Sequence, residues 1–96
     1  MTPATASHTG AGLATLCRAI GNPARLAIVR YLLAQRGPRP CGDIVAQLPL
    51  TQSTVSQHLK VLKDAGWIRA EALRHGVAYS VNAETVVEFR RLVATL

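Results

Sequence analysis

The chain has 96 residues, 49% of them hydrophobic, so it is long enough for one packed domain and too apolar to be disordered. Eleven basic and five acidic residues give it a formal net charge of +6. A small basic domain is typical of proteins that bind a polyanion, nucleic acid before membrane. A soluble basic protein without such a partner has the same charge, so the motifs have to decide between the two.

The charge is unevenly distributed along the chain. All five acidic residues lie beyond residue 42, whereas five of the eleven basic residues precede it. If the chain binds DNA, we expect this first part to supply much of the attraction to phosphate and a later helix to supply selectivity. The five early basic residues are Arg18, Arg25, Arg30, Arg36 and Arg39.

Cys17 and Cys41, the two cysteines, are too few for a disulfide framework. The N-terminus lacks the apolar run of a signal peptide, and no stretch approaches the roughly 18 apolar residues of a membrane span. We therefore expect a cytoplasmic protein with reduced thiols.

Residues 1–10 are small and polar, which predicts a flexible arm ahead of one domain over residues 11–96. Apolar side chains at helical spacing then predict a short first helix. Asn22 and Pro23 suit the cap and first position of a second helix, which we expect to run to about Gln35 and to form the centre of the core. The apolar residues of these helices are Leu13, Leu16, Cys17 and Ile20, then Leu26, Ile28, Val29, Leu32 and Leu33.

The Pro- and Gly-rich residues 36–40 predict a connector, and a third helix is expected over roughly residues 42–48. A tight turn at residues 49–51 leads into a fourth helix. Two helices joined by a tight turn, the second with a polar outer stripe, are the arrangement of a helix-turn-helix.

The fourth helix carries the pattern of a recognition helix. Thr51 suits its N-cap and Gly66 its left-handed C-terminal cap. Val55, Leu59 and Leu62 recur at helical spacing and predict the buried face. The opposite stripe is short, polar and almost uncharged, and such side chains reach base edges in a major groove, although they also suit an ordinary solvated face. The DNA contacts predicted on this helix are Gln52, Ser53, Thr54, Ser56, Gln57 and Lys60.

After Gly66 the pattern becomes that of two strands, residues 67–72 and 77–81, around a glycine suited to a hairpin turn. A hairpin directly after a recognition helix is a wing, and we predict that Arg74 and His75 at its tip contact phosphate or a minor groove. An ordinary surface hairpin with a basic tip is the alternative.

Asn82 is a candidate N-cap for a final helix over residues 83–96. Its apolar stripe must be covered, either by its own domain or by a second copy of the chain. The stripe consists of Val86, Phe89, Val93 and Leu96. The predicted fold is mainly α with a small β-hairpin: a winged helix-turn-helix in which four helices precede two strands and a last helix.

Two stretches, residues 19–29 (AIGNPARLAIV) and 50–62 (LTQSTVSQHLKVL), resemble the opening signature and recognition helix of the ArsR/SmtB-type winged-helix repressors. The likeness extends over roughly residues 13–96. It implies a homodimer that binds a palindromic DNA operator and releases it on sensing an inducer, often a metal. It also implies that His58 packs against the helix-turn-helix core. The implied dimer interface lies on the first and last helices: Leu13, Leu16, Val86, Phe89, Val93 and Leu96.

The metal site of that family does not carry over. Its thiolate site has Cys-x-Cys directly before an acidic residue, where this chain has PCGD at residues 40–43, and the last helix contains neither His nor Asp. His8, His58 and His75 are not at a metal-ligand spacing. We therefore expect neither a metal nor a cofactor. The wing also departs from the family, because Gly76 lies only three residues before Tyr79. The sequence therefore does not determine the type of turn.

The thiols suggest a different kind of sensing. Cys17 suits a small core position, whereas Cys41 starts a helix, a place that favours a thiolate. Because relatives bring an N-terminal cysteine to the helix-turn-helix of the other subunit, the resemblance implies that the two thiols could meet as a redox switch or soft-metal site. An unrelated effector, or none, is the alternative.

The prediction for function is a sequence-specific DNA-binding regulator. A winged-helix module that binds only proteins is the alternative, which the net charge and the four aromatic residues disfavour. An enzyme is not expected, because the chain shows no phosphate loop, carboxylate pair or nucleophile–base set.

Overall fold

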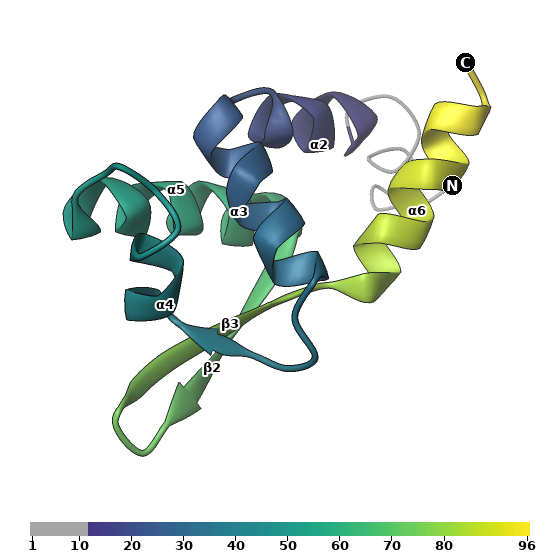
Figure 1. The fold of residues 1–96 in the computed structure, drawn as a ribbon. Helices are drawn as coiled ribbons and strands as arrows, with labels where there is room; N and C mark the ends of the chain where they lie inside the picture. Colours follow the sequence, from purple (N-terminus) through teal and green to yellow (C-terminus); the bar gives the residue numbers. More distant parts are fainter. Residues whose placement is uncertain (1–11) are drawn as a thin grey trace.

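The structure is a computed structural model that describes residues 12–96, so the predicted arm, with His8, and residue 11 lie outside the described residues. Within this range a small antiparallel sheet and a set of short helices enclose one core (Figure 1). The elements are α2 (Gly12–Ile20), α3 (Pro23–Leu33), β1 (Arg39–Pro40), α4 (Cys41–Val45), α5 (Gln52–Ala65), β2 (Ile68–Leu73), β3 (Gly76–Val81) and α6 (Ala83–Ala94).

Helix α3 begins as predicted. The side-chain oxygen of Asn22 accepts hydrogen bonds from the backbone N–H groups of Ala24 and Arg25 at 2.9 and 3.1 Å, which caps the helix. The predicted burial of Leu26 and Leu33 is wrong, since they are 38% and 52% exposed. The helix has apolar side chains on most of its circumference, but only the face with Ile28, Val29 and Leu32 is buried in the core.

The helix-turn-helix consists of α4 and α5. Helix α4 ends at Val45, three residues before the predicted end, consistent with Pro49, which disfavours a helical Leu48. Gly66 ends α5 with a φ of 95°, the left-handed geometry predicted for it. The predicted inward residues of α5 are almost fully buried: Val55, Leu59 and Leu62.

The sheet has one strand more than predicted. β1 pairs antiparallel with β3, Arg39 opposite Tyr79 and Pro40 opposite Ala78, and gives the order β1-β3-β2. The Pro-rich connector hid this strand, although an edge position suits proline, which has no N–H to donate. At the tip of the hairpin, Gly76 carries the positive φ of 116°, so the turn at residues 74–75 needs no left-handed side-chain residue.

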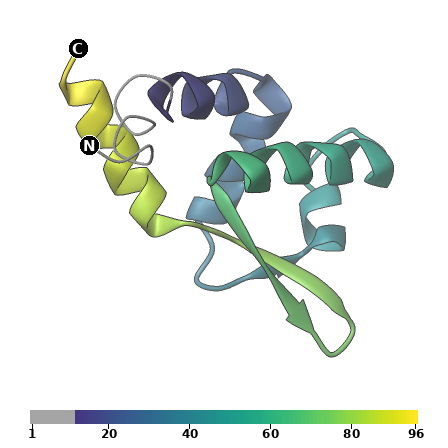
Figure 2. The ribbon, with the colours of Figure 1, turned by 180° about the vertical axis from the view of Figure 1, so that it is seen from behind.

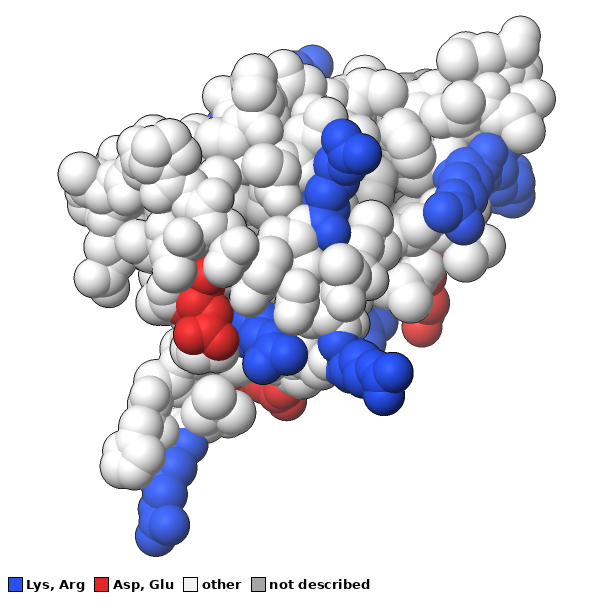
Figure 3. All heavy atoms as spheres, in the orientation of Figure 1, with Lys and Arg blue, Asp and Glu red and all other residues white. Residues whose placement is uncertain are grey.

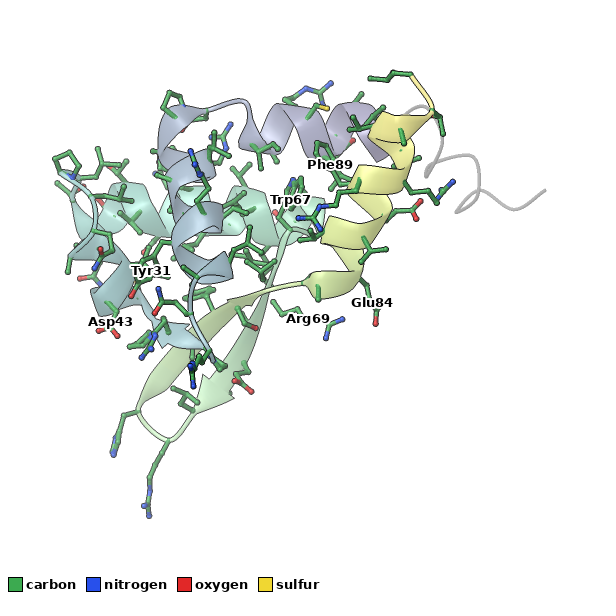
Figure 4. All side chains as sticks on the ribbon, turned by 45° about the vertical axis from the view of Figure 1, so that its right-hand side comes forward. Tyr31, Asp43, Trp67, Arg69, Glu84 and Phe89 are labelled. Atoms are coloured by element: carbon green, nitrogen blue, oxygen red, sulfur yellow. The ribbon has the colours of Figure 1, made fainter. Side chains whose placement is uncertain are left out.

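Helix α6 is attached to the core through Trp67. The ring centroids of Trp67 and Phe89 lie 5.0 Å apart in an edge-to-face arrangement. Both residues are labelled in Figure 4. The indole N–H of Trp67 donates to the carbonyl of Leu16 at 3.0 Å, so the same residue also holds α2. Leu92, which lies outside the predicted stripe, is the most buried residue of α6. Phe89 and Leu16, which the resemblance placed in the dimer interface, thus pack against residues of their own chain.

The views in Figures 1 and 2 place α3 across α5, with α2 above them and the sheet below. The β2–β3 hairpin projects away from the helices, and α6 lies at the opposite end of the molecule. Within residues 12–96, no helix has the length and apolar character needed to cross a membrane.

Candidate nucleic-acid interface

The outer face of α5 is polar and open to solvent. Because Val55, Leu59 and Leu62 hold the opposite face in the core, the predicted stripe is turned outward. The stripe is exposed along its length: Gln52, Ser53, Ser56, Gln57 and Lys60. Short hydroxyl and amide groups of this kind can pair with base edges in a major groove.

Four members of the predicted set have partners within the chain: Ser53, Thr54, Ser56 and Lys60. The ammonium of Lys60 lies 2.9 Å from a carboxylate oxygen of Asp64 one turn later, and this hydrogen bond and charge raise the pKa of Lys60 above its ordinary value. Thr54 is half-buried, and its hydroxyl lies 3.0 Å from that of Thr51 in the N-cap. The i,i+4 spacing of Lys60 and Asp64 could have revealed their pairing from the sequence.

The two cysteines have different surroundings. Cys17 is exposed, so its predicted core position is wrong; Leu16 and Ala19 form the inward face of α2. Cys41 is half-buried, and its Sγ lies 4.0 Å from the hydroxyl oxygen of Ser56 on the recognition helix. Burial, and then the charge of Cys41, raise the pKa of Tyr79 above its ordinary value. Cys41 therefore sits beside the predicted reading face.

The hairpin ends in a basic tip. Arg74 and His75 form its two-residue turn and are exposed, and the flanking Leu73 and Val77 are 48% and 42% exposed. Arg69, at the base of the hairpin, instead donates to the side chain of Asn82 at 3.2 Å. Among residues 12–96, none forms a hydrogen bond or ion pair with the side chain of Arg74, so the tip carries an exposed cation.

Two of the five early arginines form side-chain hydrogen bonds within the chain. Figure 3 shows Lys and Arg side chains spread over one face, from the hairpin tip to the region of α6. Arg25 is turned into the molecule, where its Nε donates to the carbonyl of Ala19 at 2.6 Å, and the Nε of Arg39 donates to Gln35 at 3.2 Å. Of the five residues predicted to attract phosphate, these two thus connect parts of their own chain.

The predicted dimer residues range from buried to fully exposed. Leu16 is in the core, whereas Leu13, Val86 and Phe89 are half-buried. Val93 and Leu96 are 39% and 91% exposed. Val87, at 66% exposed, is an apolar residue of α6 that the predicted stripe omitted.

The part of the chain that the structure describes contains no group of three or more His, Cys, Asp or Glu side chains placed to hold a metal ion. His58 lies half-buried beside Arg25, and His75 lies at the hairpin tip. The arrangement built by residues 12–96 is therefore an exposed polar helix face beside a basic-tipped hairpin.

The chain is similar to known helix-turn-helix proteins. A family model described as a helix-turn-helix domain matches residues 20–69. An uncharacterised helix-turn-helix transcriptional regulator of Methanocaldococcus jannaschii is 35% identical over 86% of this chain and 92% of that protein. The transcriptional repressor SmtB of Mycobacterium tuberculosis is 41% identical over 67% of this chain, but the match spans only 46% of SmtB.

A solved structure agrees with these relatives. The homodimeric winged helix-turn-helix DNA-binding domain of a possible ArsR-family regulator from Mycobacterium bovis superimposes with a TM-score of 0.71. It is 26% identical, and the match covers 88% of this chain and 76% of that one. The predicted fold and family are thereby confirmed. The chain belongs to the ArsR/SmtB-type winged helix-turn-helix family, whose members are DNA-binding transcriptional regulators and not enzymes.

Proposed function

We propose that the chain is a dimeric repressor that binds a palindromic operator and is released from it by an effector. The observation that carries the proposal is the exposed, nearly uncharged polar face of α5, held outward by its buried residues. We expect the protein to act in the cytoplasm, where its DNA lies.

We assign recognition of the DNA bases to the middle of the polar face of α5. Ser53, Ser56 and Gln57 bear hydroxyl and amide groups that match base edges, whereas Gln52, Lys60 and the wing residues Arg74 and His75 suit phosphate or groove edges. Thr54 makes a smaller contribution, because its hydroxyl is engaged with the N-cap.

Dimerisation is assigned to α2 and α6. Val87, Val93 and Leu96 expose apolar area that a second copy would remove from water. Two recognition helices in successive major grooves, roughly 34 Å apart, require a symmetric pair of half-sites. The homodimeric state of the Mycobacterium bovis neighbour supports this assignment.

The direct test is selection of duplexes from a random pool, followed by titration of the selected and a random duplex at increasing salt. We expect the pool to converge on an inverted repeat, and the affinity to fall steeply with salt because Lys and Arg displace counterions from phosphate. A pool that does not converge, with weak binding to every duplex, would favour the protein–protein module instead.

A thiol-based release mechanism is the second candidate. The contact between Cys41 and Ser56 favours it, since a group added to this sulfur would crowd the reading face. Cys17 is accessible to the same reagents. Operator release is measured after treatment with oxidant, persulfide, arsenite or zinc, for the parent and for Cys41→Ser and Cys17→Ser. If none of these agents releases the parent, or both variants respond like the parent, the thiols are not the sensor.

A further inference from the structure

Arg25 connects three helices at the place where α2 ends, α3 begins and α5 passes. Its Nε and Nη2 donate to the carbonyls of Ala19 and Arg18, at 2.6 and 3.4 Å, within the last turn of α2. Its Nη1 lies 3.4 Å from Nδ1 of His58, near the middle of α5. One planar guanidinium thus holds the end of α2 and the recognition helix together.

We propose that the contact between Arg25 and His58 positions the recognition helix relative to α2, so that operator binding depends on two side chains outside the polar stripe. The proposal rests on the proposed function. His58 is half-buried beside the core face of α5 rather than part of the exposed stripe. Arg25 comes from the first turn of α3, whose cap at Asn22 fixes where that turn starts.

The chemistry of the two side chains determines which atom donates and which accepts. Arg has only donors, so Nδ1 of His58 must be the unprotonated acceptor and Nε2 must carry the ring hydrogen. A hydrogen bond from a charged donor is stronger than one between neutral groups. Losing it allows α5 to sample more orientations, and specific binding then has to restore the one orientation that fits base edges.

Through this contact, a movement of α2 would change the position of α5. Helix α2 is one of the two helices assigned to the dimer interface, and Arg25 holds its last turn. A shift of α2 on dimerisation or effector binding would move the guanidinium and, through His58, the reading face. The link is therefore a positioning element and not a DNA contact.

The test titrates a duplex selected by the parent, and a random duplex of equal length, with the parent and three variants. His58→Phe keeps a ring and removes the acceptor; we expect operator affinity to fall roughly fivefold, and random-duplex affinity to change by less than about twofold. His58→Asn places an oxygen near the position of Nδ1 and should restore most of the loss. Arg25→Lys keeps the charge but loses the fork, and it should weaken operator binding at least as much as His58→Phe because it also releases the carbonyls of α2.

The double variant Arg25→Lys/His58→Phe should bind no more weakly than the weaker-binding of the two single variants, because each single variant already lacks the contact between Arg25 and His58. Val61→Ala, an exposed site on the same helix, is the control and should keep the operator-to-random ratio of the parent. Losses that multiply in the double variant, or a parental ratio in His58→Phe, would overturn the proposal.

Failure of the proposed function and failure of the contact give different results. A parent that selects no duplex contradicts the proposed function, and the contact is then judged by the thermal unfolding of the parent, His58→Phe, Arg25→Lys and the double variant. Coupled losses of stability support the contact as a link between α2 and α5, whereas additive losses overturn it. Because His58 does not cap α2, its variants leave that helix end intact if Arg25→Lys destabilises the fold.

Discussion

The outer faces of α5 and α6 differ in chemistry although the same core holds both helices. Helix α5 presents hydroxyl and amide groups, and Val61 is its one large exposed apolar side chain among the described residues. Helix α6 and the residues after it expose Val87, Val93 and Leu96. Hydrogen-bonding groups suit a polar partner with a fixed pattern, whereas apolar area gains free energy by leaving water. The two faces are thus suited to different partners, DNA and a second copy of the chain.

The largest expected effect comes from placing a charge on the apolar face. Val93→Asp should convert the dimer to a monomer, because a carboxylate buried in the interface would have no partner. Operator binding should then fall by about a hundredfold or more, since the two half-sites are no longer engaged together. Sedimentation and operator titration measure the two effects.

Val93 is a better site for this test than Phe89, whose ring packs on Trp67 of its own chain. A charge at Phe89 would damage the core and the interface together. Val93→Thr, which has a similar shape and no charge, is the control and should stay dimeric. If the parent itself sediments as a monomer at micromolar concentration, the apolar face of α6 is not a dimer interface.

Removing hydrogen-bonding groups from the polar face should have a smaller and more selective effect. Gln57→Ala and Ser56→Ala should each weaken operator binding by about 1–3 kcal/mol and leave binding to random duplex nearly unchanged, as expected for lost base contacts. Thr54→Ala should instead lower the melting temperature, because its side chain contacts the N-cap. Parental operator affinity in both the Ser56 and Gln57 variants would show that the reading face is elsewhere.

The features that could be predicted from the sequence depend on residues close together in the chain. The caps at Asn22, Thr51 and Asn82 accept hydrogen bonds from backbone N–H groups two or three residues away, and Gly66 acts on its own helix end. The inward face of α5 follows from a clear helical period. Local chemistry was therefore enough for the helix-turn-helix and its polar stripe.

The features that were missed depend on residues far apart. Strand β1 exists because Arg39 meets Tyr79, about forty positions later, and nothing local to a Pro-rich connector signals it. The burial of one side of α3 is likewise decided by which neighbours cover it. The contact from Arg25 to His58 spans 33 positions, so only the three-dimensional structure reveals it.

The smallest expected effect concerns the wing, where charge rather than pattern is at work. Arg74→Ala should weaken binding to operator and random duplex by the same modest factor and reduce the salt slope by about one, because one phosphate contact is lost. Arg69→Ala makes the same change at the base of the same hairpin, where the guanidinium donates to Asn82 and lies 3.8 Å from Glu84. It is therefore the matched control and should keep the parental slope. Equal slopes for the parent and Arg74→Ala would mean that the tip contacts no phosphate, and the hairpin would then be an ordinary surface hairpin beside a recognition helix that binds DNA alone.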